Sequence, residues 1–119
     1  MRMITNGLIG LVAILHLWFM ILEMFLWRKP LGRKTFKQTV AQADASATMA
    51  ANQGLYNGFL VAGLLWGLLT SDAAHALSIK VFFLSCIAVA GIFGAVTAIP
   101  QIFFIQALPA IVALALLLI

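Results

Sequence analysis

The sequence predicts an all-α fold, a transmembrane four-helix bundle with up-down topology, and three observations predict it. Of the 119 residues, 65% are hydrophobic and only 8% are charged, whereas soluble domains carry about 25% charged residues. Four apolar stretches approach the length of about 20 residues that a membrane-spanning helix requires. The connections between them are short, so consecutive helices are expected to be antiparallel neighbours within one integral membrane domain, residues 1–119.

The first two spans are predicted over residues 4–27 and 48–70, on either side of a basic loop at residues 28–38. Pro30 and Gly32 interrupt this loop. Thr39 and Gln42 have the spacing of a capping box, so a helix is expected to begin there and to enter the membrane after its first, polar turns. A cleaved signal peptide is the alternative interpretation of the first span, but the apolar run is too long and the positive cluster follows it.

The last two spans are predicted over residues 74–98 and 102–119. Asp72 is a suitable cap for the third helix, and Lys80 near its start is expected to extend its ammonium group to the membrane interface. Pro109 lies inside the fourth span, where its missing N–H is expected to free the carbonyl of Ile105 and to kink the helix.

Positive charge is concentrated in the basic loop, which holds five of the seven Lys and Arg residues of a chain with a net charge of +4. Such clusters are typical of cytoplasmic loops, so both termini are expected outside. The loop lacks the interleaved aromatic residues of a nucleic-acid surface. The predicted partner is therefore the lipid bilayer and not a nucleic acid.

The first span carries two ionisable side chains, His16 and Glu23, seven residues apart on one face. An ionisable group in hydrocarbon is costly, so it is expected to face protein, water or a ligand. Ile9, Ala13, Met20 and Trp27 complete the same stripe, which is predicted to face the bundle interior.

The second span supplies amide groups at a matching depth, because antiparallel helices bring Asn57 to the level of Glu23. The sequence thus predicts a polar binding cluster in the cytoplasmic half of the membrane: Glu23, His16, Asn57, Gln53, Asn52, Gln101 and Gln106. The alternative is that the amides bond to one another and to helix ends near the interface.

Small residues spaced four apart permit close helix approach. Two such pairs lie in the second span, Gly54 with Gly58 and Gly63 with Gly67. Either pair, or the last helix, is a candidate contact for a homo-oligomer.

The sequence contains no zinc-ligand spacing, phosphate-binding glycine loop or nucleophile elbow, and Cys86 is its only cysteine. Neither a metal, a cofactor nor a catalytic residue is therefore predicted.

Three runs of the chain resemble a known family: LHLWFMILEMFLW, KPLGRKTF and AANQGLYNGFLVAGLLWG. The most specific parts are E-M-F-L-W, from Glu23 to Trp27, and N-Q-G-x-Y-N-G, from Asn52 to Gly58. They resemble the bacterial family known as domain of unknown function 1304, over nearly the whole chain. The resemblance implies a small four-helix protein of the bacterial inner membrane and brings no activity, so no functional residue can be carried over.

Three functions remain open. The first is proton- or cation-linked transport or binding of a small solute at the cluster around Glu23. The second is an accessory or scaffold protein in which the polar residues only fix helix register. The third is a membrane-embedded enzyme, resembling a lipid or isoprenoid isomerase, in which Glu23 and His16 move protons. Solute binding or transport is ranked first, because a carboxylate within a predicted span is expected to serve a function.

Overall fold

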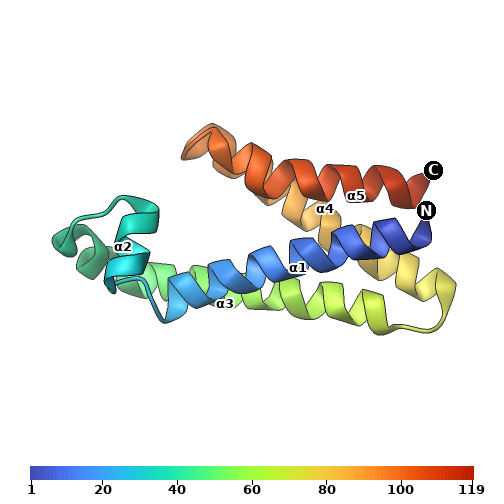
Figure 1. Cartoon of the computed structure of the whole chain (residues 1–119), viewed down its shortest axis with the longest axis horizontal. Helices are drawn as coiled ribbons and strands as arrows, with labels where there is room; N and C mark the ends of the chain where they lie inside the picture. The colour runs from blue at the N-terminus through green and yellow to red at the C-terminus, as the bar shows by residue number, and fades with distance from the viewer. The chain divides into compact units, whose positions relative to one another are not determined.

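The structure, a computed structural model that describes residues 1–119, is built from helices without strands (Figure 1). Its elements are α1 (Arg2–Met24), α2 (Pro30–Phe36), α3 (Val40–Leu69), α4 (Ala73–Thr97), the π-helical segment η1 (Phe103–Ala107) and α5 (Leu108–Leu118). The all-α prediction is confirmed. Internal contacts divide the chain into two compact units, unit 1 with residues 1–13 and 62–119 and unit 2 with residues 14–61.

In unit 2, α1 ends at Met24, three residues before the predicted end of the first span. The chain then turns, and the N–H of Leu26 donates to the carbonyl of Ile21. Trp27 follows the turn and donates from Nε1 to Ser46 Oγ at 3.0 Å, while its ring packs against Phe36 at 4.8 Å between centroids. Trp27 therefore connects the end of α1 to both α2 and α3.

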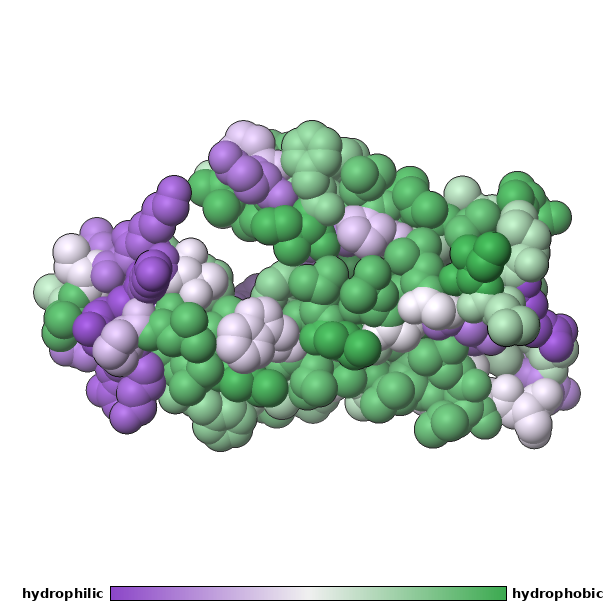
Figure 2. Space-filling view, viewed as in Figure 1, coloured by the Kyte–Doolittle hydropathy of each residue, from purple (hydrophilic) through white to green (hydrophobic).

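The basic segment differs from the predicted loop, because residues 30–36 form a helix. Pro30 occupies its first position, where a missing N–H removes no helical hydrogen bond. Lys37 ends the helix in the left-handed conformation (φ 54°, ψ 49°), and Gln38 N–H donates back to Arg33 O, as in a Schellman motif. Hydrophilic surface gathers over α2 and the adjoining turns in Figure 2.

The capping box that was predicted to start the second long helix is present. Thr39 N–H donates to Gln42 Oε1 at 2.9 Å, and Gln42 N–H donates to Thr39 Oγ1 at 3.1 Å. Within unit 2, α3 then packs closely on α1, as the glycine spacing predicted. A Cβ atom on Gly54 would lie 2.6 Å from Met24 Cγ, and one on Gly58 would lie 3.0 Å from the sulfur of Met20.

In unit 1, α4 packs along η1 and α5 and against the end of α3. Asp72 caps α4 by accepting a hydrogen bond from His75 N–H at 2.9 Å, as predicted. Gly91 permits a close approach of two helix backbones, because a Cβ atom there would lie 2.5 Å from the backbone nitrogen of Ala107.

The irregularity expected from Pro109 takes the form of a π turn. The N–H of Leu108 donates to the carbonyl of Phe103, five residues back, at the point where η1 meets α5. Pro109 directly follows Leu108 and has no backbone N–H to donate to a carbonyl of the preceding helical turn.

Two helices, α1 and α4, are long and apolar enough to cross a membrane. The stretch Phe103–Leu118 is apolar but shorter. In α3, polar residues such as Asn52, Gln53 and Asn57 lower the mean hydropathy. The structure thus supports two of the four expected spans by length and composition, and the four-span bundle stays a prediction.

Candidate functional site

The amide of Asn57 and the carboxylate of Glu23 meet in unit 2. Asn57 Nδ2 donates to Glu23 Oε1 at 2.5 Å, and Asn57 is buried while Glu23 is half-buried. The contact is possible because Gly54, one turn before Asn57, lets α3 approach the backbone of α1, with Met20 O 3.2 Å from the position of a Cβ atom. These two residues of the predicted cluster are therefore joined.

Glu23 also lines a cavity of about 520 Å³ within unit 2. The side chains that give it its charge are Glu23, Asp44, Arg28 and Lys29. Glu23 is half-buried, whereas the other three side chains are exposed. Water screens a half-buried charge less than an exposed one, so a charge on Glu23 is the least screened of the four.

His16 is fully buried and packs edge-on against Phe19, with 5.3 Å between ring centroids. Ile9 and Ala13 of the same stripe are also buried, as the stripe predicted. His16 does not line the cavity of Glu23. Its expected part in ligand binding stays a prediction.

Asn52 and Gln53 lie on the exposed side of α3. Asn52 Nδ2 donates to the carbonyl of Thr48 in its own helix at 3.1 Å. The structure brings neither residue to Glu23, and a part for them in a site around Glu23 stays a prediction.

Gln101 and Gln106 belong to unit 1. Gln101 is exposed just after Pro100, and Gln106 is half-buried within η1. Their membership of the cluster stays a prediction.

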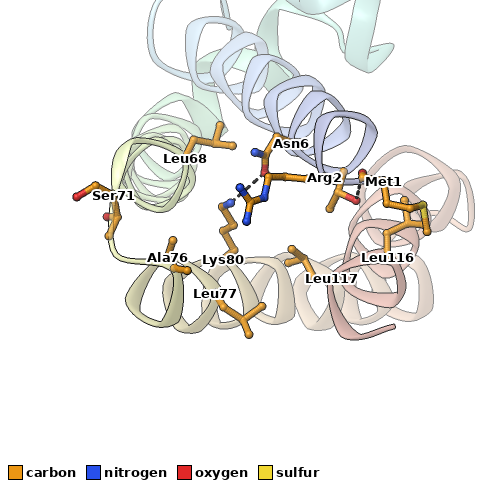
Figure 3. A pocket seen from close by; sticks show the side chains of 13 residues that line it. Met1, Arg2, Asn6, Leu68, Ser71, Ala76, Leu77, Lys80, Leu116 and Leu117 are labelled. Atoms are coloured by element: carbon orange, nitrogen blue, oxygen red, sulfur yellow. Dashed lines mark hydrogen bonds between the residues drawn. The ribbon is translucent and has the colours of Figure 1, made fainter.

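A polar pair in unit 1 was not predicted. Lys80 Nζ donates to Asn6 Oδ1 at 2.9 Å (Figure 3). The aliphatic stem of Lys80 packs on Gly67, where a Cβ atom would lie 2.8 Å from Lys80 Cγ. The sequence contains a signal for this pair, because each residue lies near the start of an apolar helix and alternate helices of an up-down bundle start at the same end.

Comparison with protein-family models matches the chain to the family described as Protein of unknown function (DUF1304), over residues 10–118. This match confirms the resemblance seen in the sequence. Comparisons with curated proteins and with solved structures gave no match.

Proposed function

The chain belongs to the DUF1304 family, and we propose that it is a multi-pass protein of the bacterial inner membrane that binds a small cationic solute or a proton at Glu23. One observation carries this proposal. Glu23 is the single carboxylate within a helix apolar enough to span a membrane, and it both accepts a hydrogen bond from Asn57 and lines a cavity. An ionisable side chain at such a position is expected to serve a function.

The proposed architecture has four spans, at residues 4–27, 48–70, 74–98 and 102–119. Large apolar side chains on α4 support it: Phe82, Phe93 and Val96 are 62%, 68% and 80% exposed. Contiguous apolar surface of this kind is rare on soluble monomers, and lipid is a solvent that would accept it.

In the proposed topology residues 28–38 face the cytoplasm and both termini lie outside. Within unit 1, Met1, Thr70 and Leu117 line one pocket. The two ends of the chain and the connection between α3 and α4 therefore lie at the same end of unit 1. Four antiparallel helices produce this arrangement, which supports the proposal.

At the site, the hydrogen bond from Asn57 engages one carboxylate oxygen, Oε1. No hydrogen bond engages Oε2, which is available to a cationic group or a proton. Arg28 and Lys29 line the exposed part of the cavity, where water screens their repulsion of a cation.

Transport, as distinct from binding, predicts an oligomer, because four helices enclose little volume. Gly54 and Gly58 face α1, whereas Gly63 and Gly67 face α4, so contacts within each unit already use both glycine pairs. We therefore propose the exposed face of α5 as the contact between copies. Cross-linking of the protein in its membrane tests this, and a protein that stays monomeric contradicts transport.

The binding proposal is tested with tetraphenylphosphonium, a lipid-soluble cation, titrated into the full chain in an uncharged detergent. Glu23→Gln is expected to weaken binding about tenfold or more, because it removes the charge opposite the ligand. Asp44→Asn is the matched control: Asp44 lines the same cavity but is exposed, so its loss is expected to change binding about twofold or less. Equal binding by Glu23→Gln and the wild type would exclude Glu23 as the site and favour the accessory function.

A further inference from the structure

Unit 1 contains a second cavity, of about 440 Å³, between the starts of α1 and α4, the connection from α3 to α4, and the end of α5 (Figure 3). Its polar lining consists of Arg2, Thr5, Asn6, Thr70, Ser71 and Lys80. No carboxylate side chain is among the lining residues. The cavity is therefore positively charged.

The two cations share this space. Figure 3 shows the guanidinium of Arg2 and the ammonium of Lys80 directed toward one another. Asn6 Oδ1 accepts one hydrogen bond from Lys80. An ammonium has three N–H donors and a guanidinium has five, so most of their donors are available to a ligand. Two like charges facing one cavity repel, and an anion between them would remove that repulsion.

No carboxylate of unit 1 neutralises these cations. Asp72 Oδ1 lies 3.3 Å from Nδ1 of His75, which makes an ion pair only when the imidazole is protonated. Asp72 also caps α4, and it does not line the cavity although both of its sequence neighbours do. An anion bound between Arg2 and Lys80 would therefore meet no competing carboxylate side chain in the cavity.

We propose that this cavity binds a phosphate group between Arg2 and Lys80, supplied either by the headgroup of an anionic membrane lipid or by free inorganic phosphate. The planar guanidinium matches two phosphate oxygens at once, and the ammonium adds a point charge. Asn6 holds the ammonium in place. Thr5 and Thr70 already donate their hydroxyl groups to the carbonyls of Met1 and Trp66.

The apolar part of the lining is compatible with a lipid. Leu77, Leu116 and Leu117 line the same cavity as the two cations. Basic pockets between membrane helices bind lipid headgroups in this manner, with the acyl chains along neighbouring apolar surface.

The test measures thermal unfolding of the full chain in an uncharged detergent, with inorganic phosphate, short-chain phosphatidylglycerol or the matching uncharged diacylglycerol. Either phosphate probe is expected to raise the Tm of the wild type, and diacylglycerol is not. Lys80→Met keeps the apolar stem and is expected to weaken the apparent affinity about tenfold, since it removes a charge-assisted hydrogen bond. Lys34→Met, which removes an exposed lysine of unit 2, is the control and should respond as the wild type does.

Asn6→Asp provides a second test that does not depend on the folding of Lys80→Met. It places a carboxylate next to the ammonium, which is expected to raise the Tm without ligand and to remove the response to phosphate.

The responses distinguish the sources. A response to phosphatidylglycerol alone identifies a lipid headgroup, a response to phosphate alone identifies a free anion, and both responses support a site for either. A wild type that responds to neither probe overturns the proposal, as does an unchanged response in both Lys80→Met and Asn6→Asp.

Discussion

The side-chain amide of Asn57 donates a hydrogen bond to the carboxylate of Glu23, a residue 34 positions earlier in the sequence. The bond joins the end of α1 to the middle of α3 within unit 2, next to the close approach of the helices at Gly54. It gives a carboxylate in a largely apolar helix a defined orientation, and its two partners can be removed separately or together.

Asn57→Leu is expected to destabilise the protein by about 1–3 kcal/mol, because it leaves a half-buried carboxylate without its donor. The double substitution Glu23→Leu with Asn57→Leu is expected to be nearly neutral, since it removes both polar partners. Unfolding of the wild type and the two variants in detergent measures the difference. A double variant that is less stable than Asn57→Leu alone would show that the carboxylate left without its donor is not what destabilises Asn57→Leu.

Glu23 is expected to react with dicyclohexylcarbodiimide in membranes, whereas Asp44 and Asp72 are expected to react only with a water-soluble carbodiimide. The first reagent dissolves in lipid and reaches carboxyl groups there, and the two aspartates are exposed outside the apolar helices. Mass spectrometry of the labelled peptides measures both reactions. Modification of Glu23 by the water-soluble reagent at the rate of Asp72 would place Glu23 in bulk solvent and contradict the proposed membrane depth.

Gly91→Ala is expected to destabilise unit 1 by about 1–3 kcal/mol, because the new methyl group would lie 2.5 Å from Ala107 N and force α4 away from η1. Gly10→Ala is the control. It meets no atom within 4 Å, so it is expected to be neutral or to stabilise α1 by up to about 1 kcal/mol. Thermal unfolding of the two variants compares them, and equal stabilities would contradict the close packing of α4 on η1.

Lys37→Gly is expected to stabilise α2 by about 1 kcal/mol, because Lys37 has the positive φ of 54° that glycine adopts without steric cost. Lys34→Gly, inside the helix, is expected to destabilise it by about 1 kcal/mol. Amide hydrogen exchange over residues 30–38 measures both effects. Faster exchange in Lys37→Gly than in the wild type would show that the left-handed turn is not formed.

The helix starts could be predicted because their signals are local. The reciprocal bonds of Thr39 with Gln42 and the cap at Asp72 involve residues three apart, which the sequence displays directly. The helix α2 could not be predicted in the same way. Pro30 and Gly32 indicate a loop, yet Pro30 starts the helix and Gly32 lies against the backbone carbonyl of Leu26, a contact that forms only after the chain has turned.

The candidate site could be predicted only in part. The depth of a residue in an antiparallel pair of helices follows from its position in the sequence. On this basis Asn57 was expected at the level of Glu23, and the structure joins the two by a hydrogen bond. The rotation of α3 about its axis does not follow from residue numbers. The side that faces α1 carries Gly54, Asn57 and Gly58, which leaves Gln53 exposed.

The sequence by itself determined the all-α class, the starts of α3 and α4, the family and the pairing of Glu23 with Asn57. Composition, local hydrogen bonds and helical spacing depend on residues close together in the chain or on the depth of a residue along its helix. Only the tertiary structure decided that residues 30–36 are helical, that Asn52 and Gln53 turn away from Glu23, and that Lys80 meets Asn6 beside Arg2. These features depend on helix rotation and on contacts between distant segments, which packing fixes and a linear pattern does not contain.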